Sequence, residues 1–341
     1  MALSGVAVGL FFAATPINQT HLPNADLASP PSVADSLPAV SPAPRVLTQG
    51  NWVVAPTEAQ ALIEQGATLL DARNHKGWNR GRTLQGAIFV TWQQFSQPDM
   101  PNQGKLLEDD VVLSQKLQEV GVSNDRPVVV IADPVQGWGE DGRIVWMLRT
   151  LGHQQSVLVN GGYQALVAAG MPVSRQIATA SATPGDFVVN RTNEWQIERD
   201  ELRSALQKQN QAKNMAVIDV REQREYHGQT PYGEQRGGHV PGAIHLYYKD
   251  LLDREGQLLS RGAILAKLAE HGITSDAEIV TYCTAGIRSG WVTSVLTDLG
   301  FRAKNYAGSM GEWASADAEQ YPLVTEPLVT EPLLTNPLLN Q

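Results

Sequence analysis

The stretch EIVTYCTAGIRSGWVTSVLTDLG, residues 278–300, has the pattern of a strand, a short loop and a helix. EIVTY is a continuous apolar and β-branched run, which is typical of a buried strand. GWVTSVLTDLG has the residue types of a helix that ends at a glycine. Cys283 lies where the strand gives way to the loop, and the 341-residue chain has no other cysteine. This stretch therefore predicts one unit of an α/β fold with a thiol at the carboxyl end of a strand.

The rest of the chain repeats itself. LLDAR (Leu69–Arg73) returns as VIDVR (Val217–Arg221), and LQGAI (Leu84–Ile88) returns as VPGAI (Val240–Ile244). The repeat continues with LQEVGVSND, which returns as LAEHGITSD, and each copy then runs into a β-branched string. Self-similarity over this length predicts two copies of one fold.

Within each copy, short Val and Ile strings alternate with amphipathic helical patterns. TEAQALIEQG (Thr57–Gly66), for example, predicts a helix that begins with a Thr57/Gln60 capping box. Strand, helix and strand at these lengths indicate parallel βαβ units. We therefore expect two open α/β domains, residues 46–175 and 185–318. Ligands of such sheets bind at the carboxyl ends of the strands, which is where Cys283 lies.

The two ends of the chain differ from its middle. Residues 1–45 begin with an apolar run, Leu3–Ala14, that no Lys or Arg precedes, and continue as a Pro-, Ser- and Ala-rich linker. This run is half of a signal-peptide pattern and too short for a stable membrane span, so export to the periplasm and a cytoplasmic location both stay open. Residues 319–341 carry a proline at every fifth position from Pro322, which predicts a disordered tail.

Charge and cysteine content exclude several classes of function. The formal net charge is -9, and the 26 Lys and Arg residues are not gathered into a run, so a nucleic-acid partner is not expected. One cysteine cannot form an intrachain disulfide or a Cys-rich metal site. The Cys283 thiol is thus either a buried small hydrophobe or a reagent.

The loop after Cys283 favours a reactive thiol over a buried, inert one. Its backbone N–H groups and the helix that follows stabilise negative charge, which lowers the pKa of a thiol. Arg288, five residues beyond Cys283, supplies a planar fork suited to binding an oxyanion. The alternative is that Cys283 is inert packing and that Arg288 is a surface charge.

Four motifs carry a family resemblance: DVREQREY (Asp219–Tyr226), GHVPGAIH (Gly238–His245), YCTAGIRS (Tyr282–Ser289) and YAGSMGEW (Tyr306–Trp313). In this order and spacing they resemble the rhodanese domain of sulfurtransferases. The doubled arrangement resembles the tandem thiosulfate and mercaptopyruvate sulfurtransferases. The resemblance implies two rhodanese-like domains, each an open five-stranded parallel sheet with helices on both faces, and no metal or organic cofactor.

The resemblance also implies a mechanism. Cys283 would take a sulfane sulfur, become a persulfide, and pass the sulfur to a thiol or to cyanide. The partners would then be a small anionic sulfur donor, thiosulfate first and a persulfide second, and one of these acceptors; the oligomeric state is left open. The substrate-binding loop would be Thr284, Ala285, Gly286, Ile287, Arg288 and Ser289. Arg236 and Lys249, next to an insertion at Gly228–Gly237, are further candidates for anion contacts.

Departures from the pattern keep other functions open. Asp133 stands where the second copy has Cys283, so the first copy is interpreted as structural. Thr284 and Ala285 fit neither substrate subtype of the tandem enzymes, and Glu225 stands where those enzymes commonly carry arginine. A non-catalytic binding module is one alternative. A phosphatase or arsenate reductase of the same fold is another, although its loop would carry one more residue between cysteine and arginine.

Several residues have a structural interpretation that we prefer. Gly137, Gly139 and Gly142 spell G-x-G-x-x-G, yet no acidic residue follows about 20 positions on, so a plain glycine turn is favoured over a nicotinamide site. His239 is expected to orient its turn, and Asp219 with Arg221 to form a buried pair. Trp291 and Trp313 are expected in the core.

Overall fold

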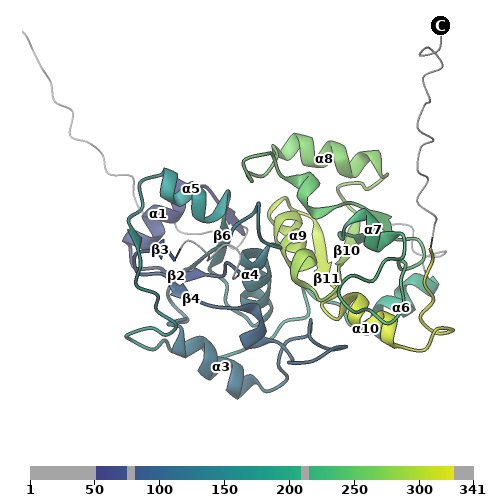
Figure 1. The fold of residues 1–341 in the computed structure, drawn as a ribbon, viewed down its shortest axis with the longest axis horizontal. Coiled ribbons are helices and arrows are strands. Elements are labelled where there is room, and N and C mark those ends of the chain that lie inside the picture. Colours follow the sequence, from purple (N-terminus) through teal and green to yellow (C-terminus); the bar gives the residue numbers. More distant parts are fainter. Residues whose placement is uncertain (1–50, 75–80, 209–214, 326–341) are drawn as a thin grey trace, which may run out of the picture. The chain divides into compact units, whose positions relative to one another are not determined.

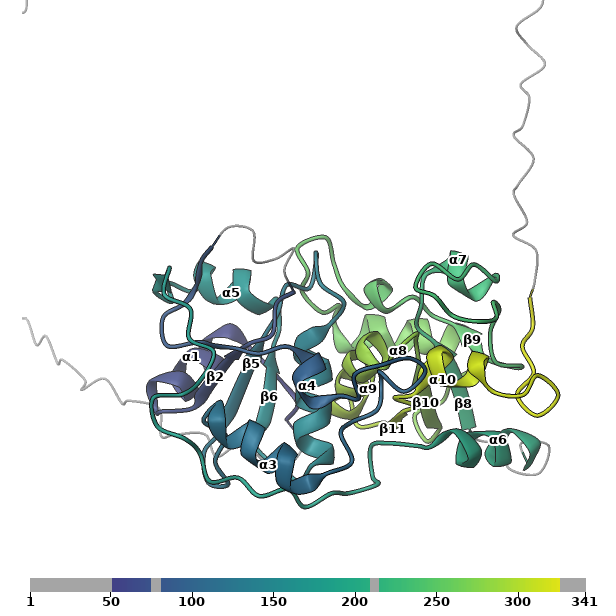
Figure 2. The same cartoon turned by 60° about the horizontal axis from the view of Figure 1, so that its bottom comes forward.

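The computed structural model describes residues 51–74, 81–208 and 215–325 (Figures 1 and 2). All of them belong to one compact unit, Val46–Gln341. The apolar and linker segment predicted for residues 1–45 lies outside the described residues, as does the tail from residue 326 onward. No helix in the described ranges combines the length and the apolar character that crossing a bilayer requires.

The first copy contains a five-stranded parallel sheet, as expected. Its strands, in spatial order, are β1 (Val53–Val54), β6 (Ser156–Val159), β5 (Val128–Ile131), β2 (Thr68–Asp71) and β4 (Ile88–Phe89). Every residue of β2, β5 and β6 is buried, and most of them are apolar, as is typical of parallel strands that are covered on both faces. A separate antiparallel ribbon joins β3 (Thr83–Leu84) to β7 (Val173–Ser174).

The sheet of the second copy has four parallel strands, one fewer than the family resemblance implies. In spatial order they are β11 (Arg302–Asn305), β10 (Glu278–Tyr282), β8 (Met215–Asp219) and β9 (Ile244–His245). At the position of the fifth strand, Gln196 forms a single parallel bridge to Asn305. Asn305 N donates to the Trp195 carbonyl and Ile197 N donates to the Asn305 carbonyl, so the pairing extends over one residue only.

Helices cover both faces of each sheet. In the first copy α1 (Pro56–Glu64) and α5 (Gly162–Ala168) pack on one face, and α3 (Asp110–Glu119) and α4 (Glu140–Thr150) on the other. In the second copy the corresponding pairs are α6 (Arg199–Lys208) with α10 (Ser309–Ser315), and α8 (Arg261–Glu270) with α9 (Ile287–Asp298). Shorter segments are η1 (Trp92–Phe95), α7 (Gln223–Tyr226) and η2 (Tyr248–Leu251).

Two local predictions were wrong. Helix α1 begins at Pro56 with Ala55 as its N-cap and has no side-chain cap, because a proline at the first helical position needs no partner for an N–H. Residues 319–325, predicted as part of the disordered tail, pack on the second copy: Tyr321 is buried, and Val324 exchanges two backbone hydrogen bonds with His239.

Helices α4 and α9 lie side by side and join the two copies (Figure 1). Their close approach depends on Gly142 and Gly290, since a Cβ on Gly142 would lie 2.6 Å from Trp291 Cα and one on Gly290 would lie 3.3 Å from Arg143 Cα. The largest hydrophobic cluster contains buried side chains from both helices and from both copies. The two copies therefore share one core, which positions residues of the first copy beside the loop of the second.

Candidate active site

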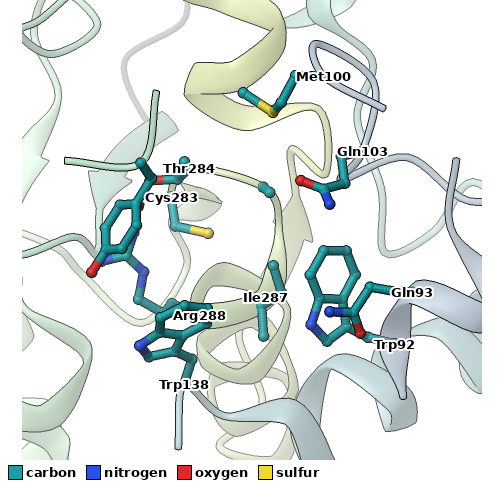
Figure 3. A pocket seen from close by; sticks show the side chains of 11 residues that line it. Trp92, Gln93, Met100, Gln103, Trp138, Cys283, Thr284, Ile287 and Arg288 are labelled. Atoms are coloured by element: carbon teal, nitrogen blue, oxygen red, sulfur yellow. Dashed lines mark hydrogen bonds between the residues drawn. The ribbon is translucent and has the colours of Figure 1, made fainter. Parts of the chain in front are cut away.

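Cys283 follows directly after β10, and α9 begins four residues later at Ile287. Gly286 makes this tight connection with φ +75°, a left-handed conformation that glycine adopts without strain. A Cβ at Gly286 would also lie 2.6 Å from the Ala307 carbonyl oxygen. Cys283 is a free thiol with only 1% of its surface exposed. Its sulfur points into a pocket (Figure 3).

Hydrogen bonds from α10 orient the Cys283 loop so that amides of the loop face the sulfur. Met310 N donates to the Cys283 carbonyl at 3.0 Å, and Gly311 N donates to the Thr284 carbonyl at 2.9 Å. Because a trans peptide directs its carbonyl and the next N–H to opposite sides, the Ala285 amide points the other way, toward Cys283 Sγ. The Ser289 amide donates to the same sulfur, and Ser289 Oγ donates to it at 3.5 Å.

These groups favour the thiolate form of Cys283. Burial is the largest single influence and acts to raise the pKa of the thiol. The positive charge of Arg288, the Ser289 hydroxyl and the amides of Ser289 and Ala285 act in the opposite direction and together lower the pKa of Cys283 below its ordinary value. A thiolate at this position is the form that acts as a nucleophile.

Arg288 does not present a free fork to the pocket, in contrast to our expectation. Its Nη1 and Nη2 donate to the two carboxylate oxygens of Glu225 at 2.6 and 2.8 Å, and Nη2 also donates to Thr284 Oγ1 at 2.8 Å. Both partners of this ion pair are buried. Burial acts to raise the pKa of Glu225, but the hydrogen bonds and charge of Arg288 outweigh it and lower that pKa. The positive charge of Arg288 thus acts on the Cys283 sulfur, while the Nη pair of Arg288 is already bound by the Glu225 carboxylate.

Thr284 connects this ion pair to a second carboxylate. Its hydroxyl lies 2.9 Å from Glu225 Oε1 and 3.1 Å from Glu234 Oε1. Glu234 comes from the insertion at Gly228–Gly237 and is buried. The insertion therefore brings negative charge to the loop, where the sequence had suggested a cation.

Arg143 is a site residue that the sequence did not indicate. It belongs to α4 of the first copy, and its buried guanidinium donates to the Gly286 carbonyl at 3.4 Å, to Ser96 Oγ at 3.0 Å and to the Gly104 carbonyl at 2.7 Å. All three acceptors are uncharged. Burial lowers the pKa of Arg143, and the charge of Cys283 acts to raise it. No motif marks this arginine, because only the packing of α4 against α9 brings it to the loop.

The pocket that Cys283 enters has a volume of about 280 Å³ and is built by both copies. The first copy contributes side chains from η1 and from the loops that precede α3 and α4, and the second contributes Tyr232 and the Cys283 loop (Figure 3). The lining residues are Trp92, Gln93, Met100, Gln103, Trp138, Tyr232, Cys283, Thr284, Ala285, Ile287 and Arg288. Four of the six predicted loop residues thus line the pocket. Of the other two, Ser289 contacts the sulfur, and Gly286 sets the turn.

Arg236 and Lys249 do not reach this pocket. The Arg236 guanidinium donates to backbone carbonyls of Trp313, Ala314, Ala316 and Tyr321, so it holds α10 and the segment that follows it. Lys249 Nζ donates to the Val135 carbonyl of the first copy at 2.8 Å. The prediction that both contact a substrate anion is therefore corrected: each binds backbone oxygens elsewhere.

The structural interpretations of several motif residues are confirmed. Asp219 and Arg221 form a buried bidentate pair. His239 stacks on Tyr226 with ring centroids 3.6 Å apart, and its Nδ1 lies 3.0 Å from the Tyr226 carbonyl, which orients the turn. Trp291 and Trp313 are buried in the core.

The equivalent loop of the first copy has no comparable centre. Asp133 Oδ1 accepts from the amides of Val135 and Gln136, so it caps its own turn. In the G-x-G-x-x-G stretch, the Glu140 carboxylate accepts from the Trp138 amide, which places negative charge where a dinucleotide phosphate would bind. Across the described part of the chain, no group of three or more His, Cys, Asp or Glu side chains is arranged to hold a metal ion.

Comparisons with known proteins point to one family. The family model described as "Rhodanese-like domain" matches residues 55–169 and 198–316. A thiosulfate sulfurtransferase of Azotobacter vinelandii is 32% identical over 77% of this chain and 94% of its own length, and one of Pseudomonas aeruginosa is 33% identical over 68% and 82%. The sulfur carrier protein TtuD of Thermus thermophilus is 28% identical over 80% and 94%.

Solved structures share the fold. The crystal structure of Tum1 from Saccharomyces cerevisiae superposes with a TM-score of 0.69 over 81% of this chain and 98% of its own, at 17% identity. The wild-type structure of EanB gives a TM-score of 0.68 over 81% and 69%, at 20% identity.

Proposed function

The chain belongs to the rhodanese family and is a sulfurtransferase, and we propose that Cys283 carries the transferred sulfur as a persulfide. The donor in this proposal is thiosulfate or a related sulfane-sulfur compound, and the acceptor is a thiol or cyanide. The observation that carries the proposal is the Cys283 sulfur itself: it enters a pocket, and two amides and a hydroxyl point at it.

The proposed cycle has two steps. In the first, the Cys283 thiolate attacks the sulfane sulfur of thiosulfate, the S–S bond of thiosulfate breaks, and sulfite leaves with the electron pair. In the second, the acceptor attacks the outer sulfur, and the bond to Cys283 Sγ breaks. The electron pair then returns to Cys283, where the amides of Ala285 and Ser289 stabilise the negative charge.

The alternatives receive less support. A phosphatase needs its loop arginine to hold the phosphoryl group, and here that fork is bound by Glu225. A binding module has no need for a thiol whose pKa is lowered.

Mass spectrometry of the intact protein tests the proposal. After incubation with thiosulfate or an organic persulfide, Cys283 is expected to gain about 32 Da, the mass of one sulfur atom. Cyanide should remove the added mass and release thiocyanate. The Cys283→Ser protein is the control, because it lacks the only thiol of the chain. Absence of the added mass with every sulfane donor would refute the persulfide and favour a binding role.

A further inference from the structure

The pocket is larger and less polar than thiosulfate or cyanide requires. Its volume of about 280 Å³ lies just below the range for pockets that bind small organic ligands, about 300–1,000 Å³. Its walls include the side chains of Trp92, Met100, Trp138, Tyr232 and Ile287. Trp138 and Met100 are exposed at the rim, and Trp138 makes an edge contact with Tyr232. Such walls favour a ligand with an apolar body.

Charges around the sulfur disfavour an additional anion. Of the described side chains that line the pocket, Arg288 alone is cationic, and both of its Nη groups are bound by Glu225. The positive charges of Arg288 and Arg143 are opposed by the carboxylates of Glu225 and Glu234 and by the Cys283 thiolate or persulfide. An incoming carboxylate would therefore face the carboxylates of Glu225 and Glu234 and the charged sulfur, and it would find the Nη pair of Arg288 already bound.

We propose that the pocket selects, as sulfur acceptor, an organic thiol that has an apolar body and carries no negative charge besides the reacting thiolate. This inference rests on the proposed function and specifies its acceptor. The acceptor thiolate forms a new S–S bond to the outer sulfur of the Cys283 persulfide, the bond between that sulfur and Cys283 Sγ breaks, and the electron pair stays on Cys283. No external oxidant or reductant is needed, because one persulfide is consumed for each one formed.

Within this proposal Glu225 is the residue that determines specificity. It does so through Arg288, since it occupies the paired Nη1 and Nη2 donors, a fork that would otherwise hold an oxyanion. The same effect applies to loading of the enzyme by thiosulfate. Replacing Glu225 by glutamine removes the charge with little change in shape, so it is expected to lower the KM for thiosulfate and to leave kcat less affected.

A single-turnover assay with matched acceptors tests the selection. Enzyme loaded with sulfur is mixed with benzyl mercaptan, with its 4-aminomethyl derivative and with its 4-carboxy derivative, and release of sulfur from Cys283 is followed by mass. The neutral and cationic thiols are expected to react at least about tenfold faster than the carboxylate. In the Glu225→Gln protein this preference should largely disappear. Equal rates for the three thiols on the wild-type enzyme would overturn the proposal.

A matched control separates the local effect from a change in net charge. Glu222 lies on the same segment and pairs with Arg224 at the surface, at 2.7 Å. Glu222→Gln alters the net charge as Glu225→Gln does, but it should keep the preference of the wild type. A loss of preference in both variants would show that the overall charge of the protein, and not Glu225, sets the selection.

Alkylation of Cys283 tests the charge selection without a persulfide. Because the chain has one thiol, iodoacetamide and iodoacetate report on the same sulfur. The ratio of their rates is expected to exceed the ratio for free cysteine by about tenfold or more, and to fall toward it in Glu225→Gln. If Cys283 accepts no sulfur from any donor, the proposed function fails while this ratio still decides the selection. If the persulfide forms but the ratio equals that of free cysteine, the proposed function stands and the inference fails.

Discussion

Alanine at Gly142 is expected to strain the contact between the two copies, where α4 packs against α9. A Cβ on Gly142 would lie 2.6 Å from both Cα and Cδ1 of Trp291. Carbon atoms in contact are about 3.5–4.0 Å apart, so one helix must move by about 1 Å. Overpacking of this kind costs about 1–3 kcal/mol of the free energy of unfolding. The better helix propensity of alanine returns at most about 1 kcal/mol.

Gly262 offers a matched control for this substitution. It lies in the first turn of α8, as Gly142 does in α4, and a Cβ there has no heavy atom within 4 Å. Gly262→Ala gains the same propensity without the clash, so the two variants should differ by the overpacking cost, about 1–3 kcal/mol.

Thermal unfolding followed by circular dichroism measures this difference. At about 2–4 °C for each kcal/mol, Gly142→Ala should melt several degrees below Gly262→Ala. Cys283 should also be alkylated faster in Gly142→Ala, because the pocket that shields it has walls from both copies. Equal melting temperatures of the two variants would contradict this expectation, since they would show that the helices separate without cost.

Three further substitutions test the electrostatics of the two copies. Ser289→Ala removes a hydroxyl that donates to the Cys283 sulfur, so alkylation at pH 7 should slow about twofold to tenfold, as expected for a hydrogen bond of about 0.5–1.5 kcal/mol; an unchanged rate would contradict the contact. Arg143→Gln removes a buried positive charge that acts on Cys283 and should move the pH midpoint of alkylation upward, whereas an unmoved midpoint would mean that Arg143 only holds the loop. Burial raises the pKa of Asp141 to about 7, so the folded protein holds a proton that the unfolded chain loses between about pH 4 and 7, and stability falls as the pH rises through this window. Asp141→Asn cannot ionise and should be more stable than the wild type at pH 8, by up to about 4 kcal/mol; parallel pH profiles of unfolding for the two proteins would contradict this.

Features that depend on residues close along the chain could be predicted from the sequence. The run from Glu278 to Tyr282 is continuously apolar and β-branched enough to predict a buried strand, and a glycine three residues beyond Cys283 permits the turn into α9. Asp219 and Arg221 are two residues apart, so their pairing is nearly a local property of one strand end. Where two local signals compete, the prediction fails, as it did when Pro56 rather than Thr57 began α1.

The chain's own order of residues thus determined the two-copy α/β fold and the thiol at the end of a strand. Tertiary structure alone decided what surrounds that thiol. Glu225 lies 63 positions from Arg288, and Arg143 lies 143 positions from Gly286, yet each makes a direct hydrogen bond there. Arg143 reaches Gly286 because helices α4 and α9 pack closely at Gly142 and Gly290. Glu225 reaches Arg288 because α7 lies next to the loop. No pattern within a single strand or helix encodes these contacts. The walls of the pocket come from both copies and therefore follow from how the copies pack, and the same packing brings Arg143 of the first copy to the loop.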